Sequence, residues 1–257
     1  MSRALVLALT ALVLVPASAG AGTTRPPLGL TATPARVALA GSVETAVRVM
    51  NPGSTSVVVD VARAGFALDL RGRPRVVART GGRAAASWLT VRPGRFVLRS
   101  GASRSVTIAS RLPPRVEPGD HDALVLLTTR PRRSGGVAVR MRLGVVVVVR
   151  APGRVVRRLA VGGLRVRRAP GARVLELLVV NKGNVTETLE RGCVRIVLRG
   201  RAGSVRLRPE PRDLRPRTGG LVQAAYRGRL RGWVTAHVEV APPSGARPVR
   251  RSFRVKV

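Results

Sequence analysis

Apolar and polar residues alternate in short runs along most of the chain, and the runs end at glycine, proline or asparagine. Two segments, Glu44 to Asp60 and Arg173 to Leu189, share one pattern in which two apolar runs are separated by an Asn-x-Gly step. Period-two spacing predicts β-strands, and Asn and Gly tolerate the positive φ of tight turns. We therefore expect two β-hairpins, one turning at Asn51 and Gly53 and the other at Asn181 and Gly183.

The two copies of this pattern also share their spacing to an upstream glycine. Gly41 lies ten residues before Asn51, and Gly171 lies ten residues before Asn181. A pattern that recurs at this distance favours a duplicated β-sandwich over a single hairpin.

The remaining segments are also short, and their boundaries carry Gly or Pro. Leu28 to Leu39 reads as an edge segment interrupted by Pro34, and Ala84 to Val91 reads as a strand whose one large ring is Trp88. No helix-period segment of useful length is present. The prediction is an all-β chain of two tandem immunoglobulin-like β-sandwiches, over residues 28–150 and 154–257, the second with about seven strands. Ala151-Pro152-Gly153 marks the boundary.

The segment Val137 to Leu143 has the clearest alternation in the chain. Val137, Val139, Met141 and Leu143 alternate with Ala138, Arg140 and Arg142, so that one face of a strand would be apolar and the other solvated. An ordinary half-buried strand explains this pattern. The alternative is a sheet edge that pairs with a strand of another protein.

The first 19 residues have the features of a secretory signal peptide. Arg3 is followed by an apolar stretch from Ala4 to Val15, and Pro16-Ala17-Ser18-Ala19 ends in a small-residue cleavage pattern. We expect cleavage after Ala19, with Ala21 as the alternative, and an extracellular or cell-envelope location. No other segment approaches the length of a membrane span.

The single cysteine, Cys193, excludes an intramolecular disulfide. Its setting at a strand start favours a small core or edge residue over a reactive thiol. Stability is therefore expected to come from packed sheets.

Formal net charge is +35, and 45 of the 47 basic residues are arginine, since only Lys182 and Lys256 are lysine. Two explanations stand side by side. A field of this size attracts polyanions such as an anionic cell-wall polymer, whereas a GC-rich genome would also fill solvent-facing positions with arginine. The arginines are scattered over both halves of the sequence, which favours a GC-rich genome as their cause. The positive electrostatic field is present whatever its origin. Specific nucleic-acid binding is disfavoured because the chain has only six aromatic residues for stacking.

The strongest candidate for catalysis or metal binding is Asp120-His121-Asp122. Neighbouring residues of a strand point to opposite faces, so His121 would not share a side with the two carboxylates. It follows Pro118-Gly119, which favours a ring that braces the connecting loop. His237 is expected to face solvent, and the charges of the loop Pro209 to Pro216 are expected to pair locally. No phosphate loop or nucleophile elbow is present, and we expect neither enzymatic activity nor a cofactor or metal.

Five segments of the first module match patterns of known families. They are Leu30 to Arg36, Val47 to Gly53, Ser87-Trp88-Leu89, Leu112-Pro113-Pro114 and Pro118 to His121. On these segments the chain resembles bacterial cell-surface proteins that interact with WxL proteins and carry a peptidoglycan-binding domain formerly named DUF916. The first module is also similar to the amino-terminal domain of periplasmic pilus chaperones.

The resemblance implies a secreted, non-enzymatic protein that binds peptidoglycan, an anionic wall polymer or a surface protein. The contact is expected at the strand Val137 to Leu143 and its arginines Arg140 and Arg142. The alternative is a chaperone-like assembly factor that acts by strand addition, and a third hypothesis is a hydrolase using His121 and Asp122.

Overall fold

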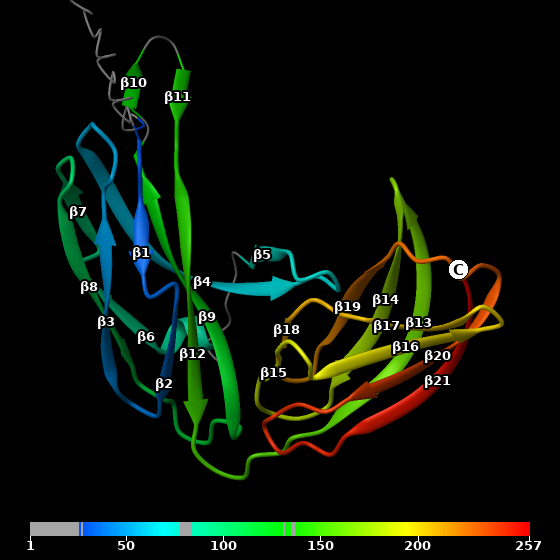
Figure 1. Cartoon of the computed structure of the whole chain (residues 1–257). Helices are drawn as coiled ribbons and strands as arrows, with labels where there is room; N and C mark the ends of the chain where they lie inside the picture. Colours follow the sequence, from blue (N-terminus) through cyan, green and yellow to red (C-terminus); the bar gives the residue numbers. More distant parts are fainter. Residues whose placement is uncertain (1–25, 27, 78–83, 131, 135–136) are drawn as a thin grey trace, which may run out of the picture.

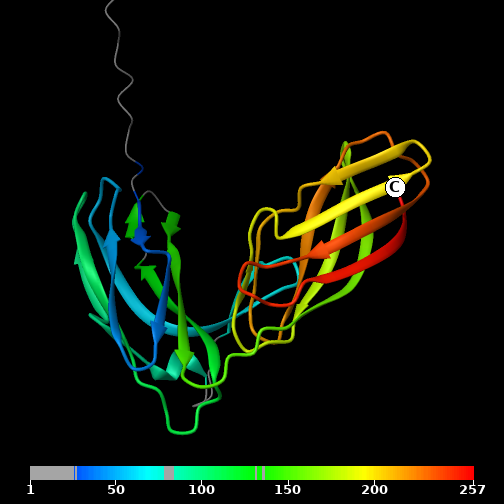
Figure 2. The same cartoon turned by 60° about the horizontal axis from the view of Figure 1, so that its bottom comes forward.

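The computed structural model describes residue 26 and residues 28–77, 84–130, 132–134 and 137–257, and the predicted signal peptide lies outside these residues. The all-β prediction is confirmed. The chain forms two β-sandwiches that spread apart like the arms of a V and meet near one end (Figure 1, Figure 2). Within the described ranges, no helix has the length and apolar character needed to cross a bilayer.

Two sheets build the first sandwich (Figure 1). One contains, in spatial order, β1 (Thr31–Thr33), β3 (Glu44–Met50), β8 (Ser103–Ser110) and β6 (Leu89–Arg92). The other contains β2 (Arg36–Ala40), β12 (Arg142–Ala151), β9 (Gly119–Thr129) and β4 (Val57–Leu68), with β5 (Pro74–Val77) and β7 (Arg95–Leu98) paired to β4. A separate pair is formed by β10 (Arg132–Ser134) and β11 (Val137–Val139).

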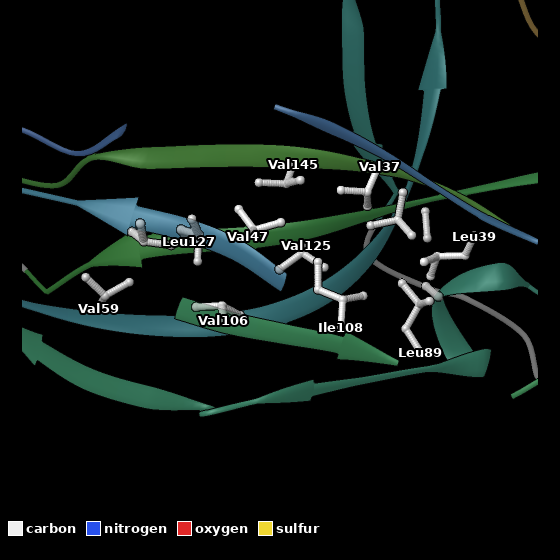
Figure 3. Close-up of a cluster of buried hydrophobic side chains, with 14 of the residues drawn as sticks. Val37, Leu39, Val47, Val59, Leu89, Val106, Ile108, Val125, Leu127 and Val145 are labelled. Carbon is white, nitrogen blue, oxygen red and sulfur yellow. The ribbon is translucent and has the colours of Figure 1, made fainter. Parts of the chain in front are cut away.

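Alternation along the strands places one set of side chains between the two sheets. Val47 and Val106, from one sheet, face Val125 and Val145 from the other (Figure 3), and all four are buried. Small β-branched side chains pack well on pleated surfaces. This explains how a sandwich with few aromatic residues still fills its core.

The second sandwich has its own core, which runs from Leu159 to Val257. One sheet contains β13 (Leu159–Ala169), β14 (Ala172–Asn181) and β19 (Gly219–Tyr226). The facing sheet contains β17 (Gly203–Leu207), β16 (Val194–Gly200), β20 (Trp233–Val240) and β21 (Val249–Lys256). A short pair is formed by β15 (Glu187–Leu189) and β18 (Arg212–Leu214).

The prediction of hairpins at the two Asn-x-Gly steps is wrong. β3 pairs with β1 and β8, whereas β4 pairs with strands of the other sheet. In the second copy β14 pairs with β13 and β19, and β15 pairs with β18. Each Asn-x-Gly step therefore carries the chain from one sheet to another, because an alternating run specifies a strand without specifying its partner.

The reason for the glycine in each step also differs from the prediction. Neither Gly53 nor Gly183 is among the positive-φ glycines of the chain. A Cβ added at Gly53 would lie 2.7 Å from the backbone nitrogen of Gly29, and one at Gly183 would lie 2.3 Å from the carbonyl oxygen of Val156. Glycine is required there because another backbone passes too closely for a side chain.

The predicted strand Ala84 to Val91 is partly wrong. Ala85–Trp88 forms a helical turn, α1, and β6 begins at Leu89. Small alanines at this point allow the turn to pack against the core, where Trp88 is buried. The predicted strand Val137 to Leu143 is also divided, since Arg140 and Met141 lie between β11 and β12.

Candidate functional site

A cleft of about 450 Å³ lies at the junction of the two sandwiches, and we call it the junction cleft. Its first wall is the outward face of β9 and β12, where Leu124 pairs with Val146 and Leu126 pairs with Gly144. Thr186, Asp213 and Arg215 of the second sandwich line it from the other side. The cleft thus combines an apolar floor with charged groups at its margins, as binding sites commonly do.

Arg215 is a largely enclosed cation of the junction. Its Nε donates to Asp122 Oδ2 at 2.6 Å, its Nη1 donates to the carbonyl oxygen of Phe66 at 2.8 Å, and its guanidinium lies 4.2 Å from the centre of the Phe66 ring. The side chains of Arg215 and Asp122 are 18% and 5% exposed. Fixed geometry and low exposure make this pair a strong candidate for holding the two sandwiches together.

Among the residues that the structure describes, three further ion pairs join the sandwiches. They are Arg36 with Asp213, Arg217 with Glu117, and Arg71 with Glu176, the last at 3.4 Å. The expectation that the charges of the loop Pro209 to Pro216 pair locally is wrong, because Asp213 and Arg215 both reach the first sandwich. The loop carries β18, which turns these side chains toward the cleft.

Asp120 connects both sandwiches through one carboxylate. It receives two hydrogen bonds from Arg150, at 2.6 and 3.0 Å, and one from the backbone N–H of Thr186 at 2.8 Å. Burial opposes ionisation, yet these three donors hold the pKa of Asp120 below its usual value. The carboxylate is therefore ionised over the whole neutral range and fixes the start of β9 to the second sandwich.

The loop after the second Asn-x-Gly step completes the junction. The side-chain amide of Asn184 donates to the carbonyl oxygens of Pro118 and Arg154, at 2.9 and 2.8 Å. The backbone carbonyl oxygen of Asn184 accepts the N–H of Asp120 at 2.8 Å. A Cβ at Gly119 would lie 2.1 Å from that carbonyl oxygen. The two loops therefore pack backbone against backbone, which leaves little freedom for the angle between the sandwiches.

The hairpin of β4 and β5 extends from the first sandwich toward the second (Figure 1). At its tip, the carbonyl oxygen of Leu70 accepts hydrogen bonds from the Leu221 N–H at 2.6 Å and from Arg212 at 3.0 Å. The junction is thus clamped at two places, at the loops around Asp120 and at this hairpin.

One half of β12 lacks a strand partner on one side. β2 pairs with Val146 to Arg150, and in the described part of the chain no strand pairs on that side with Arg142 to Val145. The Val146 N–H donates to Ala35 on the β2 side, and strand alternation directs the backbone groups of Gly144 and Arg142 the same way. These groups form an open edge beside the junction cleft.

The predicted binding residues lie around this edge. Arg142 lines the cleft, and Met141 and Leu143 pack in part against the core. Val139 is 47% exposed and Arg140 is exposed, both beyond the sandwich body, whereas of Val137 only the backbone in β11 is described. The side chains of Met141 and Leu143 are therefore directed in part to the core, whereas that of Val139 is exposed.

Several junction residues were missed by the sequence analysis, namely Gly144, Asn184, Arg212 and Arg215. One signal could have found them. The chain has only 12 acidic residues against 47 basic ones, and three of them lie between Glu117 and Asp122. Scarce carboxylates gathered in a loop region indicate specific cationic partners elsewhere.

No protein-family model matches the chain, and no curated protein does. Its fold, however, is that of pilus chaperones. A chain from a chaperone–tip adhesin complex of CFA/I fimbriae biogenesis is similar with a TM-score of 0.50 and 12% identity, over 87% of this chain and 98% of that one. The YadV chaperone and the class 5 fimbriae chaperone CfaA are similar with TM-scores of 0.48, at 11% and 12% identity, over 88% and 89% of this chain and 98% and 99% of theirs.

The remaining candidates for chemistry are occupied by structural contacts. His121 Nε2 is 2.7 Å from the carbonyl oxygen of Glu117, and its ring lies edge-on to Trp88 with centroids 4.8 Å apart. Asp122 is bound by Arg215. Among the described residues, no cluster of three or more His, Cys, Asp or Glu side chains could hold a metal ion.

Proposed function

We propose that the chain is an exported, non-enzymatic protein that binds a second protein by strand addition, in the manner of an assembly chaperone. The open edge of β12 beside the junction cleft carries this proposal. Unpaired backbone groups at a sheet edge are a template for an extended segment of another chain. The tip adhesin bound in the similar chaperone complex supports a protein partner.

The residues that line the junction cleft indicate which sequence pattern the bound segment would need. A strand paired with Arg142 and Gly144 would extend the sheet whose outward face carries Leu126 and Val146. Every second side chain of the added strand would lie beside this apolar surface. A partner segment with alternating apolar residues therefore fits best.

Arg142 adds an electrostatic preference. Its exposed side chain lines the cleft and forms no ion pair with a carboxylate of the described residues. Arg36 and Arg215, in contrast, are already paired with Asp213 and Asp122. An acidic group at the end of the bound segment would pair with Arg142.

The test removes one hydrogen-bond donor from the open edge. Gly144→Pro deletes an N–H that faces away from β9, so the pairing of β12 with β9 is retained. Gly144→Ala is the matched control, because the nearest neighbours of its Cβ would be side-chain carbons of Leu124 and Leu126, at 3.4 and 3.8 Å, which is ordinary van der Waals contact. Exported proteins encoded beside this gene are co-expressed with each variant, and complex formation is measured by gel filtration and hydrogen exchange.

We expect a one-to-one complex with the wild type and with Gly144→Ala, with slowed amide exchange at Arg142 and Gly144. Gly144→Pro should lose the complex while keeping its thermal stability within a few degrees. A complex that survives Gly144→Pro unchanged, or that leaves those amides unprotected, would overturn strand addition at this edge.

A further inference from the structure

The outward face of the sheet β17-β16-β20-β21 concentrates positive charge, and we call it the cationic face. Strand register places six basic side chains on it, together with one carboxylate, Glu239. The basic residues are exposed and comprise Arg195, Arg199, Arg206, Arg250, Arg254 and Lys256. This face is on the second sandwich, away from the residues that line the junction cleft.

The outward faces of two four-stranded sheets can be compared to test whether the general arginine content accounts for the cationic face. The four-stranded sheet β1-β3-β8-β6 of the first sandwich also has one outward face. By the same register, its basic residues are Arg48 and Arg92, with Glu44 as its carboxylate. Compositional bias acts on both sheets, so six cations on one face against two on the other mark a local feature.

The cations form two rows. Arg195 and Arg199 on β16, with Arg206 on β17, make one row, and Arg250, Arg254 and Lys256 on β21 make the other. β20 lies between them and presents Thr235, His237 and Glu239. Strands in a sheet are about 4.8 Å apart, so the rows on β16 and β21 are separated by roughly 10 Å.

A shallow hollow of about 640 Å³ lies at the Glu239 end of the two rows, where Arg195, Arg206 and Arg250 line it together with Arg251. Short or polar side chains form its floor, including Val197, His237 and Ser252, and His237 Nδ1 is 3.0 Å from Ser252 Oγ. Glu239 bonds Arg250, at 2.7 and 2.9 Å, and lies 3.5 Å from Arg195. This carboxylate fixes two arginines at one end of the hollow and leaves the others available.

An exposed ring lies at the other end of the same face. Trp233 is 60% exposed, and the Arg254 guanidinium lies 5.2 Å from the centre of its ring. A large aromatic ring with this exposure is unusual for a soluble surface and is a frequent contact residue. Its neighbour by strand register is Lys256.

We infer that the cationic face binds a linear acidic polysaccharide, with its carboxylates or other anionic groups on the two rows of cations and a sugar ring against Trp233. Charge complementarity supplies the attraction, and hydroxyl groups suit the polar floor at His237 and Ser252. Single-stranded nucleic acid would stack successive bases on several aromatic rings, and this face has one. A bilayer surface would favour an apolar stripe, and here polar residues occupy the floor.

The experiment uses polygalacturonate as the probe and neutral dextran as the uncharged control, with the mature chain. Affinity is measured by titration calorimetry at several salt concentrations. Quenching of tryptophan fluorescence by acrylamide reports on Trp233, because the other tryptophan, Trp88, is buried. The variant R199Q/R206Q/R254Q tests the rows, and R48Q/R92Q/R99Q removes the same charge from exposed positions of the first sandwich.

We expect saturable, salt-sensitive binding of polygalacturonate that shields Trp233, weakened about tenfold or more by R199Q/R206Q/R254Q and less than about twofold by R48Q/R92Q/R99Q. Trp233→Ala should weaken binding at high salt as well as at low salt. Gly144→Pro should leave it unchanged, which separates this face from the open edge of β12. Equal losses in the two triple variants, or tighter binding of single-stranded DNA or of phosphatidylglycerol vesicles, would overturn the inference.

Discussion

Asn51 and Asn181 make the same hydrogen bonds in the two sandwiches. Each side-chain amide donates at 2.8 Å to the carbonyl oxygen four residues later, Thr55 in one copy and Val185 in the other. Each Oδ1 accepts the N–H of the glycine two residues later, and each amide also reaches a carbonyl oxygen on a distant segment, Leu98 or Leu214. Both asparagines are fully buried, so each step between sheets is organised by one side chain.

Replacing either asparagine should destabilise its sandwich. Asn51→Ala and Asn181→Ala leave buried carbonyl and N–H groups without partners, and each unsatisfied group costs about 1 to 3 kcal/mol. We expect each variant to lower the free energy of unfolding by more than about 2 kcal/mol in denaturant titrations. Ser105→Ala, at an exposed position of β8, is the control. A loss in the asparagine variants no larger than in the control would contradict the assigned role.

Adding a methyl group at Gly183 should lower the stability of the folded chain much more than adding one at Gly163. Neither glycine has positive φ, so the comparison isolates space from conformation. The added Cβ would lie 2.3 Å from the Val156 carbonyl oxygen at Gly183, whereas nothing lies within 4 Å at Gly163. We expect Gly183→Ala to lose about 1 to 3 kcal/mol of stability, and Gly163→Ala to change it little. Equal melting temperatures for the two variants would refute the close approach.

The ion pairs at the junction should contribute differently to the stability of the folded chain, and the more buried pair should contribute more. Arg215→Gln leaves Asp122 largely buried without its cation, and breaking a buried pair costs about 3 to 5 kcal/mol. Arg217 and Glu117 are more than half exposed, so Arg217→Gln should have little effect on stability, because solvent screens an exposed ion pair. Small-angle scattering should show a more open pair of sandwiches for Arg215→Gln alone. An unchanged scattering profile for that variant would be the contrary result.

Acid should loosen the junction before it unfolds the sandwiches. Arg217 lowers the pKa of Glu117, and hydrogen bonds lower those of Asp120 and Glu176 despite the opposing effect of burial. A carboxyl whose pKa is lower in the folded state stabilises that state above its unfolded pKa, and this contribution is lost as pH falls through the folded value. The ordinary pKa is 3.8 for an aspartate and 4.5 for a glutamate, so the loss of stability begins near pH 4.5 and continues below pH 4.

Scattering and near-ultraviolet circular dichroism, recorded together from pH 7 to pH 2, would follow this change. We expect the radius of gyration to rise before the dichroism signal of the cores is lost. Asp120→Asn should reduce the pH dependence of the first change. Simultaneous loss of both signals in the wild type would show that the junction does not open separately.

The sequence pattern predicts the strands well because alternation is a local property of each segment. It fails at strand pairing, since the run from Glu44 to Met50 has the same appearance whether its neighbour in the sheet is β4 or β8. Pairing depends on which faces are buried together, and this is decided by the whole sandwich. The same limit explains why the Asn-x-Gly steps were interpreted as hairpins.

The junction could not be predicted from local pattern for a related reason. Arg215 and Asp122 are 93 residues apart, and nothing near either residue specifies the other. In a chain with 45 arginines, composition does not distinguish an arginine that holds two domains together from one that faces solvent. The sequence predicts a binding strand at Val137 to Leu143, and this stays a prediction. The unpaired part of β12 runs from Arg142 to Val145, because β2 pairs with β12 only from Val146 to Arg150, which local alternation does not reveal.

The two arginines around the open edge of β12 have an effect on encounters between copies of the chain. Two copies that met edge to edge would bring Arg140 and Arg142 of one molecule against the same side chains of the other, with no carboxylate of this edge to separate them. Like charges placed opposite each other disfavour pairing. Pairing of this edge with a second copy of the chain is therefore disfavoured, whereas a neutral or acidic strand would meet no such repulsion.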